Sequence, residues 1–212
     1  AMFINQNYFS SDLSSWDVSN VTNMGAMFAS VNNNDFGFLS QWDVSNVTEM
    51  GLMFYDAGGV FGDIGNWNVS NVINMANMFA GSDILDLSYH GLNNWDVSSV
   101  TDMSFMFANT GVYGNIDNWD VSNVTTMAGM FFDASLFGMD YDITGTTLET
   151  IEMNLGLWNI SNVTDMTNMF TIQDDDDFFG LSRANYDKIL IGWAQQDVQQ
   201  GVIFQSFDAN YC

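Results

Sequence analysis

The sequence predicts a repeat solenoid, in which stacked coils each contain a short strand and a helical turn. Three observations predict it. One motif recurs six times within 212 residues, the motif itself never changes length, and the chain changes character after the last copy. A unit of this size cannot bury an apolar face alone, whereas stacked units form a continuous core.

Each copy of the motif begins at a tryptophan and ends at a phenylalanine twelve residues later. Its pattern is W-[DN]-[VI]-S-[NS]-V-x-x-M-x-x-M-F, and an aliphatic residue stands three positions before each tryptophan. The tryptophans are Trp16, Trp42, Trp67, Trp95, Trp119 and Trp158. The steps between them are 26, 25, 28, 24 and 39 residues, so the connecting segments absorb all of the variation.

We expect the [LI]-x-x-W-x-[VI] segment to form the strand, because alternation places its side chains on one face. The V-x-x-M-x-x-M-F segment should form a tight turn and a helical turn, because Met and Phe recur at steps of three and four residues. The remainder is the return loop. This arrangement predicts that Trp42, Met50, Met53 and Phe54 are buried against their counterparts in adjacent coils, where adaptable thioethers fill the core.

This pattern divides the chain into two regions, a repeat array and a C-terminal cap. Residues 1–180 are expected to form about seven coils, of which the first is partial and ends at Met2-Phe3. Residues 132–157 are either a degenerate coil or an inserted loop. Residues 181–212 are expected to form a C-terminal cap, with an amphipathic helix from Ser182 to Ala194 and a last strand at 202–204.

The charge balance excludes several classes of partner. The chain has 2 basic and 26 acidic residues, a formal net charge of −24. Nucleic acids and anionic membrane surfaces are bound through clusters of Lys and Arg, so neither is an expected partner. No apolar run is long enough to insert into a membrane. The single cysteine, Cys212, precludes an internal disulfide.

The position after each tryptophan is acidic or amide in every copy, which would place like charges on adjacent coils. Its members are Asp17, Asp43, Asn68, Asp96, Asp120 and Asn159. We expect these side chains to accept hydrogen bonds from N–H groups two residues further on, as in Asx-turns. The alternative is that cations bridge neighbouring coils.

The run Asp174-Asp175-Asp176-Asp177 is the candidate metal site. Carboxylate oxygens in an irregular loop suit calcium, which is therefore the one cofactor that the sequence suggests. The alternative is a solvated acidic loop, because the run lacks the spacing of a calcium-binding loop that ends in Glu.

The repeat beginning Leu13-Ser14-Ser15-Trp16-Asp17-Val18-Ser19-Asn20-Val21-Thr22-Asn23-Met24 resembles the bacterial surface protein repeat of BspA-like and mycoplasma-lipoprotein-like proteins. The ending from Leu181 to Trp193 resembles the segment that closes such arrays. The resemblance implies a leucine-rich-repeat-like solenoid and a protein exported to the extracellular space or cell surface, with a role in adhesion. Because the chain begins inside a repeat and ends at the cysteine of that family, we expect it to continue into further repeats or domains of a longer parent chain. The resemblance supplies no catalytic residues.

The function that we expect is that of a surface adhesin or interaction module, not an enzyme. It would bind a protein or glycan of another cell or of the same assembly through the variable return half of each coil. The candidate ligand-binding residues are Tyr55, Asp56, Tyr89, His90 and Tyr113, because aromatic and polar side chains suit both protein and sugar contacts. The alternatives are a structural spacer in a long extracellular protein and a polysaccharide-acting enzyme.

Overall fold

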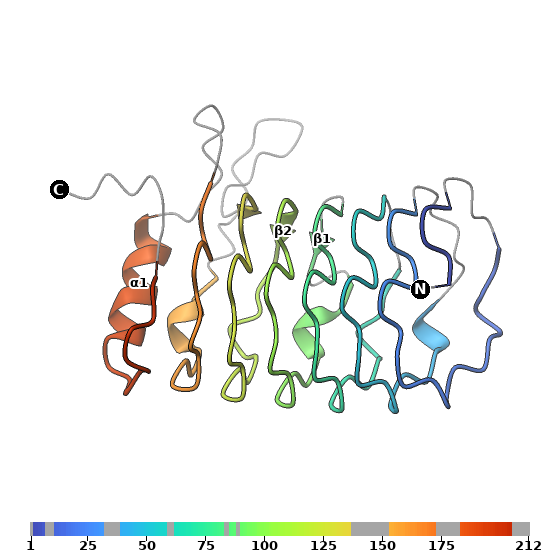
Figure 1. Ribbon diagram of the computed structural model, residues 1–212, viewed down its shortest axis with the longest axis horizontal. Coiled ribbons are helices and arrows are strands. Elements are labelled where there is room, and N and C mark those ends of the chain that lie inside the picture. Colours follow the sequence, from blue (N-terminus) through green and yellow to red (C-terminus); the bar gives the residue numbers. More distant parts are fainter. Residues whose placement is uncertain are drawn as a thin grey trace.

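The computed structural model describes residues 2–6, 11–31, 39–58, 62–82, 85–87, 90–136, 153–172 and 183–204. Successive copies of the motif lie side by side along the long axis of the molecule, and helix α1 (Arg183–Trp193) lies at the C-terminal end (Figure 1). Isolated parallel bridges join each copy to the next, from Asn23–Glu49 through to Thr126–Asp165. We name each coil by its tryptophan.

A 3₁₀ turn, and not a strand, precedes the tryptophan of several coils. These turns are η1 (Leu39–Gln41), η2 (Leu92–Asn94) and η3 (Leu155–Leu157). The Trp42 N–H donates to the Leu39 carbonyl at 3.0 Å, and equivalent bonds recur in the other coils. A strand would place residues three apart on opposite faces, whereas a 3₁₀ turn places them on the same side. The predicted strand was therefore wrong at this position, because Leu39 and Trp42 must both point inward.

Parallel pairing occurs at two other positions in the coil. One is the residue before the first methionine, where the isolated bridges form. The other is the return half, where β1 (Leu85–Asp86), β2 (Gly111–Tyr113) and β3 (Ser135–Leu136) form a parallel sheet in the order β1-β2-β3. Its register pairs Leu85 with Val112 and Val112 with Leu136.

The M-x-x-M-F segment is a run of consecutive turns and not the predicted helical turn. Alternate N–H groups donate to the next coil, as Leu52 N does to Ala76 O at 2.8 Å and Phe54 N does to Met78 O at 2.9 Å. The intervening Met53 N–H donates back to Met50 O at 3.1 Å. The chain can alternate in this way because Leu52 and Asp56 have φ of 61° and 49°, which a right-handed helix does not permit.

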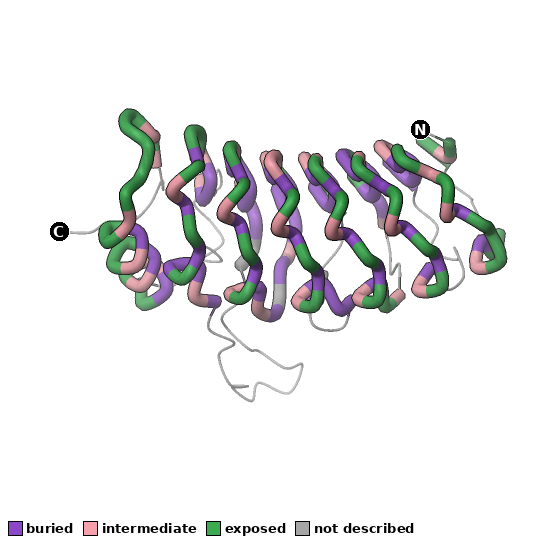
Figure 2. Tube along the Cα trace, turned by 90° about the horizontal axis from the view of Figure 1, so that it is seen from below, coloured by how far each residue is buried: buried purple, intermediate pink, exposed green. Residues whose placement is uncertain are grey.

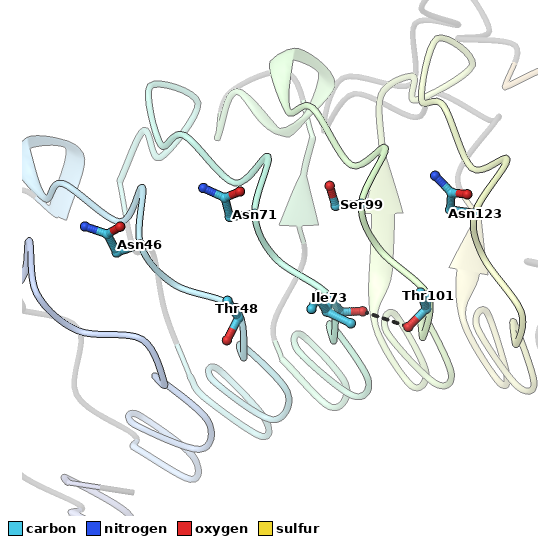
Figure 3. Close-up of a pocket in the computed structure, with 7 residues that line it drawn as sticks. All are labelled: Asn46, Thr48, Asn71, Ile73, Ser99, Thr101 and Asn123. Atoms are coloured by element: carbon cyan, nitrogen blue, oxygen red, sulfur yellow. Dashed lines mark hydrogen bonds between the residues drawn. The ribbon is translucent and has the colours of Figure 1, made fainter.

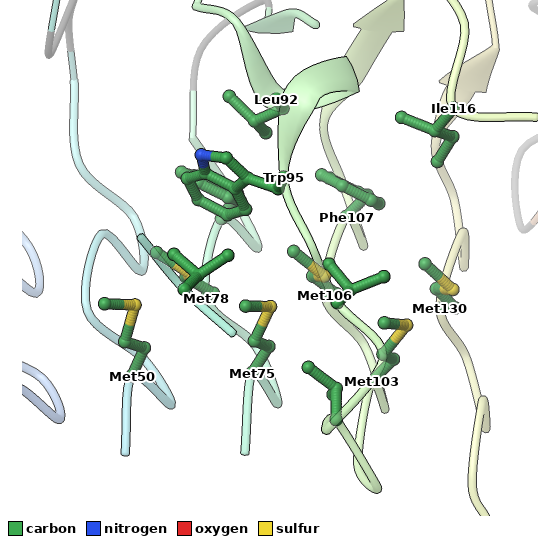
Figure 4. Packing of buried hydrophobic residues seen from close by; sticks show 14 of the residues in the cluster. Met50, Met75, Met78, Leu92, Trp95, Met103, Met106, Phe107, Ile116 and Met130 are labelled. Carbon is green, nitrogen blue, oxygen red and sulfur yellow. The ribbon is translucent and has the colours of Figure 1, made fainter. Parts of the chain in front are cut away.

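The core consists of columns of identical side chains that run through the stack. The predicted burial of Trp42, Met50, Met53 and Phe54 is confirmed, since each is at most 4% exposed. The Trp42 and Trp67 rings stack at 6.4 Å with an interplanar angle of 4°. Methionines fill the space beside these columns (Figure 4). Buried and exposed positions alternate along each coil, so the core faces inward throughout (Figure 2).

Each buried indole is also bonded to the preceding coil. The Trp42 Nε1–H donates to Leu13 O at 2.9 Å, and the same bond recurs at Trp67, Trp95, Trp119 and Trp158. A buried indole N–H without an acceptor would carry a desolvation penalty. The 3₁₀ turn therefore supplies both an inward aliphatic side chain and the acceptor for the next tryptophan.

The C-terminal segment reproduces the contacts of one more coil. Trp193, at the end of α1, donates Nε1–H to Leu155 O at 2.9 Å, as a repeat tryptophan would. Gln199 donates to Ser161 O at 2.8 Å, in the manner of a repeat asparagine. Phe204 pairs with Met166 through a parallel bridge and lies edge-on to the Phe170 ring at 5.9 Å. The helix lies within the predicted range. Trp193 at its end, and Gln196 and Gln199 after it, donate to backbone carbonyls of the last coil.

Candidate functional site

Two rows of outward side chains run along one face of the stack (Figure 3). From the Trp42 coil to the Trp158 coil the valine of the S-[NS]-V-[TI] segment is buried, so the side chains on either side of it point outward. The first row contains Asn46, Asn71, Ser99 and Asn123, and the second contains Thr48, Ile73 and Thr101. We call these the Asn row and the Thr row.

Both rows are hydrogen-bonded from coil to coil. Asn46 and Asn71 donate Nδ2–H to the carbonyls of Ser19 and Ser45, each at 2.8 Å. The Thr125 hydroxyl donates to the carbonyl of Thr101 at 3.0 Å. The equivalent bonds recur at Asn123 and Asn162, and at Thr48, Thr101 and Thr164. These side chains therefore support the stack, and the exposed ones also present polar atoms at its surface.

A shallow groove of about 580 Å³ lies on these rows, across the coils from Trp42 to Trp119. Its lining is uncharged, although the chain has a net charge of −24. Ile73 is the apolar member of the lining and is 48% exposed. The groove lining therefore contains no pair of carboxylates of the kind that glycoside hydrolysis needs.

The acidic column after each tryptophan forms the expected Asx-turns. The backbone N–H of Ser19 donates to Asp17 Oδ1 at 3.1 Å, and the Ser19 hydroxyl donates to the same oxygen at 2.6 Å. The serine hydroxyl, followed by the backbone N–H, lowers the pKa of Asp17, and Ser45 lowers the pKa of Asp43 in the same way. The structural interpretation of this column is therefore confirmed.

A second candidate site lies on the turn run, where several bulky side chains are exposed. Tyr55 and Asp56, two of the predicted ligand-binding residues, are both exposed. Leu52 is 41% exposed in the same turn run, and Phe105 is 37% exposed two coils further on. The Phe105 ring lies against Gly129 and is 6.3 Å from the half-buried Phe132 ring. We call Leu52, Tyr55, Asp56, Phe105 and Phe132 the turn edge.

The other predicted ligand-binding residues are placed differently. His90 is 4% exposed, and its Nδ1 lies 2.9 Å from the Gly62 carbonyl oxygen, so its side chain helps to hold the return loop. Tyr113 ends β2, and the structure describes its backbone only. Tyr89 lies outside the described residues. Within the described part of the chain, only Tyr55 and Asp56 of the five are placed together at the surface.

The predicted calcium ligands Asp174 to Asp177 also lie outside the described residues. Across the part of the chain that the structure does describe, no three His, Cys, Asp or Glu side chains are grouped closely enough to hold a metal ion. Searched over the same residues, no helix has the length and apolar character needed to cross a membrane.

Comparison with known families matches the chain twice to one family model. The matches cover residues 1–90 and 83–174, and the family is described as "Mycoplasma protein of unknown function, DUF285". The chain belongs to this family. Each matched segment contains three copies of the motif, and together the segments include both rows and the turn edge. No curated protein and no solved structure matches the chain.

Sequence reasoning missed Leu52, Phe105 and Ser99 as candidate surface residues. The signal that could have found them is departure from their own columns. Leu52 and Phe105 stand where other DUF285 coils of this chain have Ala26, Asn77, Gly129 and Asn168. Ser99 stands where the other five copies have asparagine. Ile73, in a different copy, stands where the other five copies have threonine. In a regular array the exceptions indicate where the surface differs.

Proposed function

We propose that this chain is an interaction module of an exported, BspA-like bacterial surface protein, built as a leucine-rich-repeat-like solenoid. It binds a protein or glycan partner through the turn edge. The match to the DUF285 family supports the kinship to mycoplasma repeat proteins. The expectations of a surface location and of adhesion come from the resemblance in the motif.

The single observation that carries the proposal is the conformation of Leu52 and Phe105. Both are large apolar residues with positive φ, 61° and 54°, and both are substantially exposed. A left-handed conformation costs a residue with a side chain about 1–2 kcal/mol, which Gly or Asn largely avoids. Burial does not repay this cost fully, because much of each side chain stays in solvent. Strained residues of this kind concentrate at functional sites.

The position of Tyr55 supports the same surface. Its column contains a buried alanine in each of the two adjacent coils, Ala29 and Ala80, and another at Ala108 one coil further on. A tyrosine that is 40% exposed among alanines adds a large amphipathic contact surface that packing does not require. Together with Asp56 it offers the aromatic and polar groups that protein and sugar contacts use.

The test is a binding screen of the chain against glycans and cell-surface proteins, repeated with Leu52→Asn and Tyr55→Ala. We expect each variant to weaken binding of the identified partner at least tenfold. Ile191→Ser is the matched control, because Ile191 is 64% exposed on α1, away from the turn edge. Absence of any partner would favour the spacer, and hydrolysis of a glycan in the screen would favour the enzyme.

Calcium remains a separate proposal for Asp174 to Asp177. A cation bound only by the folded chain stabilises it by mass action. Calcium accepts irregular oxygen cages that magnesium does not, so it should raise the melting temperature more than magnesium at equal ionic strength. Equal shifts with both ions would mean that they only screen the charge of −24.

A further inference from the structure

Two exceptions to the regular rows occur on adjacent coils and meet at the groove. Ile73 of the Trp67 coil interrupts the Thr row, and Ser99 of the Trp95 coil interrupts the Asn row. Both residues line the groove (Figure 3). All of the other copies have threonine and asparagine at these positions. The groove thus lies where the array departs from its own pattern.

The Ser99 exception changes the hydrogen bonding of the coil before it. In four other coils the asparagine amide donates to the carbonyl of the preceding coil's serine, as Asn71 does to Ser45 O and Asn123 does to Ser98 O. The corresponding acceptor for position 99 is the Ser70 carbonyl. Among the hydrogen bonds between described residues, none ends on Ser70 O. A serine is also shorter than an asparagine, so this position offers both space and an acceptor.

The Ile73 exception adds an apolar side chain to the groove that Ser99 also lines. Ile73 is 48% exposed between two threonines, Thr48 and Thr101. Its backbone N–H still donates to Thr48 O at 2.9 Å, so the coil keeps its register. The groove lining thus combines an exposed aliphatic side chain with hydroxyl and amide groups, and it carries no charge. The Ser70 carbonyl is the acceptor that an asparagine at position 99 would reach, by analogy with the other coils.

This combination fits an N-acetyl group. Such a group has a methyl that needs an apolar contact, an N–H that needs an acceptor and a carbonyl that needs a donor. Ile73 meets the first need, Ser70 O the second, and the second Nδ2–H of Asn71 or Asn123 the third. Sugar hydroxyls have further partners in the threonine and asparagine oxygens of the lining.

Two other ligand classes fit less well. An extended peptide binds a sheet by pairing with free backbone groups at an edge. Here the backbone N–H groups of the Thr row already donate to the preceding coil, as Thr101 N does to Ile73 O at 2.9 Å. Anionic glycans are disfavoured because the protein carries a net charge of −24 and only two cationic side chains.

We propose that the groove around Ile73 and Ser99 binds a neutral glycan that carries N-acetyl groups, with the acetamido methyl on Ile73 and its N–H on Ser70 O. The site lies on the Asn and Thr rows and does not involve the turn edge. The groove proposal can therefore be tested independently of the function proposed for the turn edge.

The experiment measures binding of β-1,4-linked N-acetylglucosamine oligomers to the full chain by calorimetry, with glucose oligomers of the same linkage as the comparison. The decisive variants are Ile73→Thr and Ser99→Asn, which restore the residues found in the other copies. Each should fold at least as well as the wild type, because Ser99→Asn adds a hydrogen bond and Ile73→Thr removes an exposed apolar side chain. Each should weaken binding of the N-acetylated oligomer at least tenfold.

Asn162→Ser is the matched control, because it makes the Asn-to-Ser exchange outside the groove lining and should leave the affinity unchanged. Equal binding of glucose oligomers would overturn the role of the acetamido group. Binding that survives both restoring variants, weakening by Asn162→Ser equal to theirs, or no binding of either sugar by the folded chain would overturn the site. Loss of binding in both restoring variants with unchanged unfolding midpoints would support it.

Discussion

The inner and outer sides of the same coils obey different rules. Inside, each column repeats one residue type, and its members are in contact, as the Phe54 and Phe79 rings are at 5.7 Å. Outside, columns that could be equally regular contain exceptions, such as Leu52, Ile73 and Ser99. From this difference we infer that the inner columns determine stability, and we place recognition at the outer exceptions.

The largest effect is expected from the inner column. Phe79 is fully buried between Phe54 and Phe107, so Phe79→Ala leaves a cavity in the middle of the stack. We expect a loss of about 3–5 kcal/mol in the free energy of unfolding, measured by chemical denaturation. A loss below about 1 kcal/mol would mean that the column does not form a continuous core.

An intermediate loss of stability is expected at Gly129, a buried residue that contacts the exposed Phe105 ring. Gly129 has φ of 58°, and the Phe105 ring occupies the space where a Cβ would lie. Gly129→Ala should therefore cost about 2 kcal/mol or more, from backbone strain and from the clash. Ala26 tolerates φ of 51° in the same column, so Phe105→Asn in the Gly129→Ala background should recover the part due to the clash. No recovery in this double variant would show that the ring and the glycine are not coupled.

A smaller effect is expected at the exposed Asx-turns. The Ser45 hydroxyl and N–H lower the pKa of Asp43, so Ser45→Ala should raise that pKa towards its ordinary value. Because the folded pKa is lowered, the stabilisation is fully present above the unfolded pKa of about 4 and is lost as the pH falls through the folded value. Titration of the Asp43 carboxyl carbon by NMR checks the shift, with Asp17 as the internal control. An unchanged Asp43 titration would show that Ser45 does not hold this carboxylate.

Burial of the core side chains could be predicted from the sequence more accurately than the backbone conformation of the coil. Burial of Trp42, Met50, Met53 and Phe54 follows from strict repetition of large apolar residues, whatever the local backbone. The backbone conformation predicted around these residues is wrong at two places. Spacing of three residues before Trp42 was assigned to a strand where a 3₁₀ turn forms, and steps of three and four after Met50 were assigned to a helical turn. Spacing alone does not reveal the left-handed backbone conformation of Leu52, because the Leu52 N–H donates to a carbonyl of the next coil and not to one of its own coil.

The outer side could be predicted only in part. Tyr55, Asp56 and His90 are predicted on the same grounds, as aromatic or polar residues in the variable part of the coil. Tyr55 and Asp56 are exposed, whereas the His90 ring faces a carbonyl of the return loop, a contact between residues 28 apart that no local pattern shows. The departures at Ile73 and Ser99, in consecutive copies, can be seen in the sequence. The groove that joins them depends on how the two rows lie relative to each other in space, which the sequence does not show.

The separation of the two sides is tested most directly by the free energy of unfolding of one triple variant, Leu52→Asn, Tyr55→Ala and Phe105→Asn. Each replacement already occurs elsewhere in the same column, at Asn77, Ala80 and Asn168. Relief of left-handed strain at Leu52 and Phe105 should offset the lost ring contact of Phe105 with Phe132. We predict that the triple variant remains within about 1 kcal/mol of the wild type. A loss comparable to that of Phe79→Ala would contradict the separation of the inner and outer sides, because the turn edge would then contribute to the stability of the stack.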